Sequence, residues 1–244
     1  MTAWRKLAPT AQRLPLPWAV LCAMLGAAVR IFQARDLAAK WLFMHHTYVR
    51  PGEADALKVR QLIPPTPAAG PAFSAWGVLL APTEDAKPGK TGVFDEAIKV
   101  DDPRLWPVLL ALTAGRPPDE RVWTRSLEEE LHIFDTVVET LKLAPLRPCR
   151  YALRHGGASH DLLHHHRSLP EIKRRGRWRA DSSLLRYAKE TRLLSELRKI
   201  DSSIVELGNQ VELLLPGVIL GTVPAPAGPP IIVRPGRKRA RLLS

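Results

Sequence analysis

Hydrophobic positions recur at helical spacing in the first part of the chain. Between Trp18 and His46 they follow a helical period, interrupted by no proline, which predicts one or two buried helices. Residues 14–29 are apolar and follow basic residues, so a secretory signal peptide is the alternative. Arg30 ends this run short of the roughly 18 residues that a membrane span needs, and the helical pattern continues beyond it. We therefore favour buried helices.

The middle of the chain changes to a strand pattern. Residues 73–80 and 93–100 are rich in apolar residues, and proline and glycine turn signals separate them. This arrangement predicts an antiparallel hairpin. Short helices are predicted before and after it, at 53–59 and 105–112. The predicted fold is therefore mainly α with a small antiparallel β-sheet, an α+β class.

The clearest helix signal follows Ser126. Ser126 and Glu129 form a capping-box pattern, which is typical of a helix N-terminus. Apolar residues then recur at intervals of 4, 3, 4 and 3, a spacing that predicts one buried stripe. The residues of this predicted stripe are Leu127, Leu131, Phe134, Val138 and Leu141.

The C-terminal part divides into a periodic and an aperiodic segment. From Leu193 to Val211 apolar residues keep a helical period, which predicts a long helix. Residues 216–244 lose the period, contain six prolines and end in the basic run 237–241, which favours a disordered tail. The basic run also suits a nuclear-import signal or a DNA contact. The predicted organisation is an N-terminal tail over 1–16, one domain over 17–215 and this tail.

Charge narrows the class of partner. The formal net charge is +12, and residues 147–199 hold 14 Lys and Arg against 5 Asp and Glu, a net +9. Such an excess favours a polyanionic partner such as nucleic acid, with an anionic membrane surface as the alternative. Cys22 and Cys149 are too few for a disulfide framework or a zinc module and fit a reducing compartment.

Four motifs in order carry a family resemblance. Arg50 is followed three residues later by a glutamate and then by an apolar helix, and a Lys-bearing hairpin turn comes next. The segment 151–159 reads Tyr-Ala-Leu-Arg-His-Gly-Gly-Ala-Ser, and Trp178 in the segment 174–178 precedes Tyr187 by nine residues. This ordered set resembles the catalytic domain of the tyrosine recombinases, the phage-integrase family, of a mobile-element-like type.

The resemblance implies site-specific DNA recombination or integration. A strand would be cut and rejoined through a covalent phosphotyrosyl intermediate, with no cofactor and no metal ion. Tyr187 would be the nucleophile, Arg50 and Arg154 would bind the phosphate, and Lys90 would protonate the leaving oxygen, with Lys87 as the alternate. Trp178 would donate its indole N–H to the phosphate. The remaining member of the catalytic set is Tyr151, which stands where the family usually has histidine.

The resemblance also implies partners and further contacts. Double-stranded DNA would be the substrate, bound by a tetramer on paired DNA, with no membrane association. The location would be the nucleus in a eukaryote and otherwise the cytoplasm with the DNA. The family usually has an N-terminal helical domain that closes round DNA, for which the 17 residues before Trp18 are too few. The expected DNA contacts are Arg174, Arg175, Arg177, Arg179 and His155.

Three other hypotheses stay open. A noncatalytic DNA-binding relative would keep the fold and the basic face without turnover. A basic membrane-surface protein would use residues 14–29. His160 and His164, spaced i and i+4, could share a helix face as metal ligands, although only Asp161 offers a nearby acidic third ligand.

Overall fold

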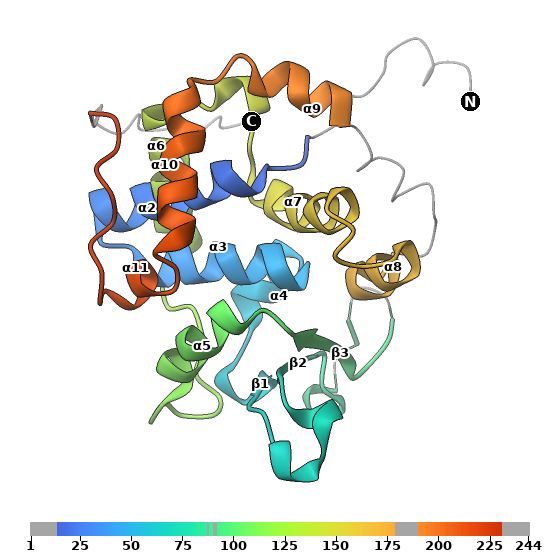
Figure 1. The fold of residues 1–244 in the computed structure, drawn as a ribbon. Helices are drawn as coiled ribbons and strands as arrows, with labels where there is room; N and C mark the ends of the chain where they lie inside the picture. The colour runs from blue at the N-terminus through green and yellow to red at the C-terminus, as the bar shows by residue number, and fades with distance from the viewer. Residues whose placement is uncertain (1–13, 87, 90–91, 179–189, 231–244) are drawn as a thin grey trace, which may run out of the picture.

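A computed structural model describes residues 14–86, 88–89, 92–178 and 190–230. The described chain is mainly helical and carries a small three-stranded antiparallel sheet at one end (Figure 1). The predicted α+β class is therefore confirmed. Around one hydrophobic core, the helices α2, α3, α6, α7 and α10 pack, while the sheet and α5 cover its lower end in the view of Figure 1.

Most of the predicted helices are present. The α-helices are α2 (Trp18–Phe32), α3 (Arg35–Thr47), α4 (Pro51–Ala56), α5 (Trp106–Thr113), α6 (Leu127–Thr140), α7 (Arg150–Leu163), α8 (Leu169–Gly176), α9 (Glu190–Leu197), α10 (Ser202–Leu213) and α11 (Gly217–Leu220). Short 3-10 turns, η1 to η6, are Val59–Gln61, Pro67–Ala69, Pro71–Phe73, Thr83–Asp85, Pro103–Leu105 and Ala144–Leu146. The short helices predicted at 53–59 and 105–112 correspond to α4 and α5, with shifted ends.

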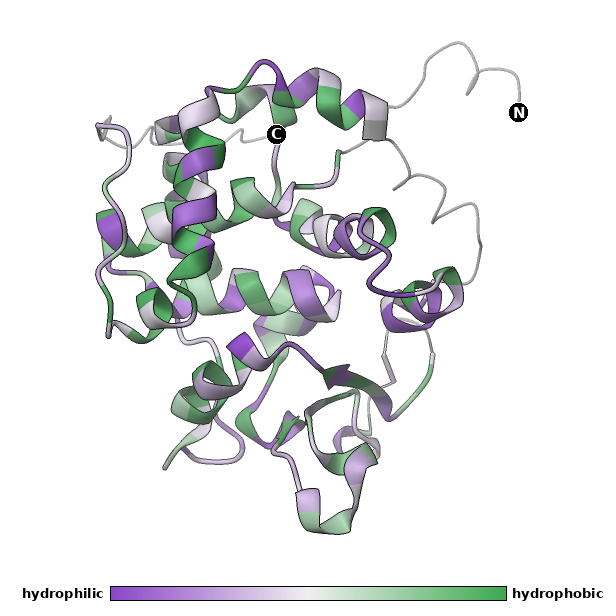
Figure 2. Cartoon of the chain, in the orientation of Figure 1, coloured by the Kyte–Doolittle hydropathy of each residue, from purple (hydrophilic) through white to green (hydrophobic). Residues whose placement is uncertain are grey.

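The helix α2 forms the centre of the core, as its continuous apolar sequence predicts. Every residue from Val20 to Val29 is buried, and most of α2 is white or green in Figure 2. Its backbone lies close against α10, because a Cβ on Gly208 would overlap the carbonyl group of Ala19. Among the described residues, no helix combines the length and apolarity needed to cross a membrane.

The predicted hairpin is confirmed, and it gains a third strand. β2 (Trp76–Leu80) pairs antiparallel with β3 (Glu96–Val100), with Trp76 opposite Val100, and β1 (Leu62–Ile63) pairs with the other edge of β2. Buried and half-buried residues alternate along β2, as expected for a sheet with one face on the core. Because β3 leads into η5 and α5, the sheet closes one end of the helical core.

The helix after Ser126 starts as predicted but buries a different face. The capping box is present: the amide of Glu129 donates to Ser126 Oγ at 3.1 Å, and the amide of Ser126 donates to Glu129 Oε2 at 3.0 Å. Leu127 and Leu131, however, are 51% and 37% exposed, so the predicted stripe is wrong in its first half. Glu130 is buried instead, because cations from two other helices hold its carboxylate inside.

The predicted long C-terminal helix is two helices. α9 ends at Leu197, and α10 begins after Asp201, whose side chain accepts a hydrogen bond from the amide of Ser203 at 3.0 Å. An N-cap of this kind starts a new helix. The apolar residues on both sides of the break still pack on the same core, which is why the period continues through it.

The predicted disordered tail is wrong for residues 216–230. α11 lies within this segment, and its residues Val218 and Ile219 are buried in the core. Farther on, Arg30 donates hydrogen bonds to the carbonyl oxygens of Gly228 and Pro229, at 3.2 and 3.0 Å. A few apolar contacts and one arginine therefore order a sequence that has no helical period. Residues 231–244, with the basic run 237–241, lie outside the described residues.

Candidate functional site

Segments far apart in the sequence meet beside the first half of α7. Arg50 directly precedes α4, Arg154 lies on α7, and Trp178 follows α8. The guanidinium carbon of Arg154 lies 4.9 Å from the centroid of the Trp178 ring. Arg50, Tyr151 and Arg177 all interact electrostatically with Arg154. The structure thus brings together the described members of the predicted catalytic set, which are Arg50, Tyr151, Arg154 and Trp178.

Glu53 joins two of the arginines. Its carboxylate accepts the backbone amide of Arg50 at 2.7 Å, the side chain of Arg50 at 2.5 Å, and both Nη atoms of Arg177 at 2.6 and 2.9 Å. Burial acts to raise the pKa of Glu53, but the hydrogen bonds from Arg177 and Arg50 outweigh it and lower the pKa. Glu53 therefore stays ionised, starts α4 and fixes Arg177 beside Arg50.

Arg154 is the most deeply buried cation of the site. It is 1% exposed, and its Nη2 donates to the carbonyl oxygen of Gly176. Its Nε and Nη1 are buried and have no hydrogen-bond partner among the described residues. Burial and the positive charge of Arg177 lower the pKa of Arg154 to about 10, so it remains a cation at neutral pH. An unpaired buried cation is unfavourable, and a bound anion would relieve it.

Close packing places Trp178 over Arg154. A Cβ on Gly176 would overlap the six-membered ring of Trp178, so only glycine leaves room for the indole. On another side, the ring of Tyr48 stacks on Trp178 with 6.1 Å between centroids. A guanidinium against an indole face gains a cation–π attraction. The Gly-Arg-Trp step at the end of α8 thus places the indole against the Arg154 guanidinium.

A cavity of about 690 Å³ opens beside these residues. Arg50, Glu53 and Tyr151 line it, together with two further cations, Lys58 and Arg121. Arg154, which is 1% exposed, is not among the lining residues. The remaining wall comes from α4, η1 and the β2–β3 connection, through Pro51, Gly52, Ala56, Gln61, Leu80, Ala81, Asp85, Pro88, Gly89 and Glu96.

The expected DNA contacts differ in how they are placed. Arg174 is exposed. Arg175 donates to the carbonyl oxygens of His46 and Lys99, each at 2.8 Å, and Arg177 pairs with Glu53 and Glu96. These two guanidinium groups thus serve internal contacts. The fourth described candidate, His155, packs its ring 5.1 Å from that of Tyr151.

Several predicted residues cannot be placed in this site. The nucleophile candidate Tyr187 and the expected DNA contact Arg179 lie in 179–189, outside the described residues. Both candidate lysines, Lys90 and Lys87, also lie outside them, although the flanking Pro88 and Gly89 line the cavity. The assignment of these four residues therefore rests on the family resemblance alone.

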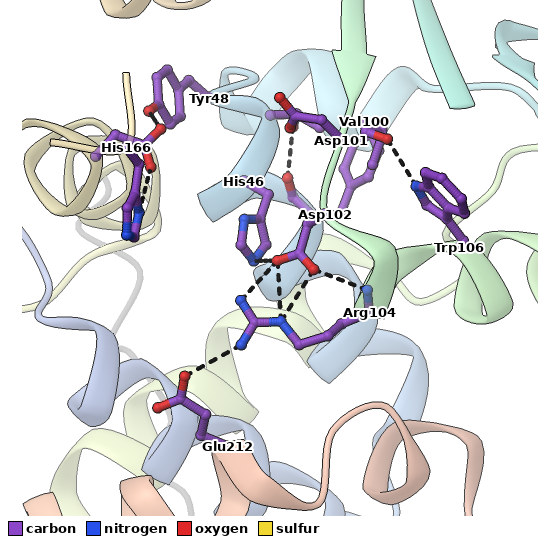
Figure 3. A network of polar contacts seen from close by, with 12 residues as sticks. His46, Tyr48, Val100, Asp101, Asp102, Arg104, Trp106, His166 and Glu212 are labelled. Carbon is purple, nitrogen blue, oxygen red and sulfur yellow. Dashed lines mark hydrogen bonds and ion pairs between the residues drawn. The ribbon is translucent and has the colours of Figure 1, made fainter. Parts of the chain in front are cut away.

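A separate polar network ties the sheet end to the helices. Figure 3 shows Asp102 between His46 and Arg104, and Arg104 reaching Glu212. His46 Nε2 lies 2.7 Å from Asp102 Oδ2, and Arg104 Nη1 lies 3.3 Å from Glu212 Oε1. Burial acts to raise the pKa of Asp102, but hydrogen bonds from His46 and Arg104 outweigh it and lower the pKa strongly. The network joins η5 to α3 and α10.

His160 of α7 packs against His164 and His166, which follow the helix. The ring of His160 lies 4.5 Å from that of His164 and 5.1 Å from that of His166, between centroids. Burial and the neighbouring imidazoles lower the pKa of His160 to about 4. Over the described ranges, no group of three His, Cys, Asp or Glu side chains is arranged to hold a metal ion.

The charged residues that flank the site were not predicted from the sequence. Arg150 directly precedes Tyr151, and its guanidinium is bound by Asp55 and Glu130. A charged residue within an apolar helix pattern, such as Glu130, is a signal for a buried ion pair, but its partners come from other helices. Nothing in the local sequence indicates which residues they are.

Comparison with known proteins found no relative. No protein-family model, no curated protein and no solved structure matches the chain.

Proposed function

We propose that this chain binds double-stranded DNA and breaks and rejoins one strand through a covalent bond to Tyr187. The arginine cluster of the candidate site would bind the phosphate of the DNA backbone. The observation that carries the proposal is Arg154, a buried guanidinium whose Nε and Nη1 have no hydrogen-bond partner among the described residues. Arg50 and Arg177 lie near it, and a phosphate would supply the missing acceptors.

The arginines suit the charge that develops during phosphoryl transfer. The phenolate oxygen of Tyr187 would form a bond to phosphorus while the bond to the 5′ oxygen breaks. Negative charge then gathers on the nonbridging oxygens, where Arg50 and Arg154 would donate hydrogen bonds. Lys90 would give its proton to the leaving oxygen, which becomes a 5′ hydroxyl. The reverse sequence rejoins the strand without ATP, because the phosphodiester energy is kept in the phosphotyrosyl bond.

Tyr151 changes one part of this chemistry. It lines the cavity beside Arg50, at the position where the resembled family usually has histidine. A phenol donates a hydrogen bond to a phosphate oxygen, but it does not act as a base near neutral pH. The proposal therefore gives Tyr151 a binding role and predicts slower turnover than a histidine would allow.

The decisive experiment is covalent capture of DNA. Wild-type protein is incubated with a nicked suicide substrate, on which the cut end diffuses away and leaves the protein attached. Tyr187→Phe should abolish capture, whereas Tyr151→Phe, the matched loss of one phenol, should slow it and leave the end point unchanged. Denaturing gels with labelled DNA measure both. A wild type that never captures any substrate would overturn strand transfer for this chain.

A second candidate is a noncatalytic DNA-binding relative. The burial of Arg154 favours it, because the 1% exposed side chain does not line the cavity and would need a local opening to touch DNA. This candidate predicts salt-sensitive DNA binding that Tyr187→Phe leaves unchanged, together with no covalent capture.

Strand transfer would further imply a tetramer on paired DNA, in the nucleus of a eukaryote or otherwise in the cytoplasm with the DNA.

A further inference from the structure

Four charged side chains form a network behind the candidate site. They come from four different helices: Lys40 from α3, Asp55 from α4, Glu130 from α6 and Arg150 from α7. Lys40 Nζ lies 2.6 Å from Asp55 Oδ1 and 2.7 Å from Glu130 Oε2. Arg150 Nε donates to Glu130 Oε1 at 2.9 Å, and Arg150 Nη2 also binds Asp55. Two cations and two anions leave the network neutral.

Burial makes the geometry of this network strict. The side chains of Lys40 and Glu130 are 3% and 1% exposed, so neither can exchange its partner for water. Glu130 Oε1 also accepts the indole N–H of Trp41 at 3.2 Å. Because buried charges tolerate few arrangements that satisfy all their hydrogen bonds, such a network fixes how its helices sit relative to one another.

The network joins the two halves of the candidate phosphate site. Asp55 lies on α4, which Arg50 precedes, two residues beyond the Glu53 that binds Arg50 and Arg177. Arg150 is the first residue of α7, next to Tyr151 and one turn before Arg154. The contact between Asp55 and Arg150 therefore links the half that carries Arg50 directly to the half that carries Arg154.

We propose that Glu130 and Asp55 are positioning residues of the phosphate site. By holding Arg150 from two sides, they would keep Arg50 at the separation from Tyr151 and Arg154 that a phosphate requires. This inference rests on the proposed function, because it assumes that the site binds the DNA backbone. Neither carboxylate would touch the DNA, and both would act through Arg150.

Net charge alone predicts the opposite change in DNA affinity from a positioning role, so the two can be told apart by experiment. Removing a carboxylate makes this basic protein more positive and should strengthen its long-range attraction to DNA. A positioning role predicts weaker binding, because the two halves of the site lose their tie. Replacement of each acid by its amide keeps the size of the side chain and changes only charge and hydrogen bonding.

The test compares Glu130→Gln and Asp55→Asn with Asp36→Asn as a matched control. Asp36 pairs with Arg125 Nε at 2.8 and 2.9 Å, and its side chain is 30% exposed, against 32% for Asp55. Fluorescence anisotropy with a short labelled duplex measures affinity, and far-UV circular dichroism confirms folding. We expect Glu130→Gln and Asp55→Asn to weaken binding by about tenfold, as displaced supporting groups do elsewhere. Asp36→Asn should leave binding unchanged or slightly tighter.

The outcomes of this experiment separate failure of the proposed function from failure of the positioning role. Wild-type protein that binds no DNA would overturn the proposed function and this inference with it. Wild-type binding, with folded Glu130→Gln and Asp55→Asn proteins that bind as well as Asp36→Asn, would overturn the positioning role alone. If Glu130→Gln fails to fold, Asp55→Asn decides, since Asp55 lies at the more exposed end of the network.

Discussion

Arg150 and Arg154 lie one turn apart on α7, and their surroundings differ in one respect. Arg150 is held by the carboxylates of Asp55 and Glu130. Arg154 is more deeply buried, yet its Nε and Nη1 have no partner within the described chain, and the positive charges of Arg177 and Arg50 act against its own. Similar arginines on one helix are therefore in opposite electrostatic environments.

This difference distinguishes a guanidinium that stabilises the fold, Arg150, from one that is available to bind a ligand, Arg154. A buried guanidinium with its carboxylates is satisfied and needs nothing more. One with buried N–H groups that have no acceptor destabilises the fold, and a bound anion would relieve that cost. We therefore expect the network around Arg150 to stabilise the fold and the cluster around Arg154 not to do so.

The largest effect should come from Glu130→Ala. It would leave Lys40 and Arg150 each without one buried acceptor, and breaking a buried pair from one side costs about 3–5 kcal/mol. Urea unfolding, with the slope checked for a constant exposed surface, measures the free energy of unfolding. A loss below 1 kcal/mol, about the value of an exposed pair, would show that this network contributes little.

Gly176→Ala should have the next largest effect. The added methyl group would overlap the Trp178 ring, and overpacking of this kind costs about 1–3 kcal/mol. It should also displace the indole from Arg154 and so weaken DNA binding. Urea unfolding measures the loss of stability, and tryptophan fluorescence measures the displacement of the indole. Gly52→Ala serves as the control for stability alone, because a Cβ at Gly52 meets no atom within 4 Å, although Gly52 lines the candidate cavity.

Mild acid should weaken the histidine cluster before the Arg150 network. The pKa of His160 is lowered to about 4, and that of the buried His45 is also lowered, mainly by burial. The folded state therefore binds fewer protons than the unfolded chain, and stability falls as the pH drops from about 6.5 toward 4. For His160 alone, solvent screening reduces the loss to about 1 kcal/mol.

The Arg150 network should respond only at lower pH. Burial acts to raise the pKa of Asp55, but hydrogen bonds from Lys40 and Arg150 outweigh it and lower the pKa. Its contribution is thus present above the unfolded-state pKa of about 3.9 and is lost below that value. Urea unfolding from pH 7.5 down to about 2 checks this order. A His160→Gln protein that keeps the full pH dependence would contradict the role given to the histidines.

The smallest change in stability should come from Arg154→Met. Removing an unpaired buried cation and keeping an apolar chain of similar length should change the free energy of unfolding by less than about 1 kcal/mol. Inorganic phosphate should stabilise the wild type by about 1.4 kcal/mol at ten times its dissociation constant, and should not stabilise the variant. Thermal unfolding with and without phosphate measures this. If phosphate stabilises both proteins equally, Arg154 does not bind it.

Local signals in the sequence predicted much of the fold. The apolar period of α2 and α3, the Ser126 cap of α6 and the hairpin of β2 and β3 all appear at the expected places, because each depends on near neighbours in the chain. The errors have tertiary causes. Partners from α3 and α7 turn the Glu130 face of α6 inward, and core contacts order residues 216–230.

For the candidate site, too, the sequence predicted some features and only the tertiary structure decided others. The sequence alone was enough to single out Arg50, Tyr151, Arg154 and Trp178, because their types and order form a motif pattern. Only the tertiary structure decided that Arg154 Nε and Nη1 lack acceptors within the described chain, while Arg150 is held by two carboxylates. Hydrogen bonding and burial depend on side chains brought in from distant helices, and no spacing along the chain encodes those distances.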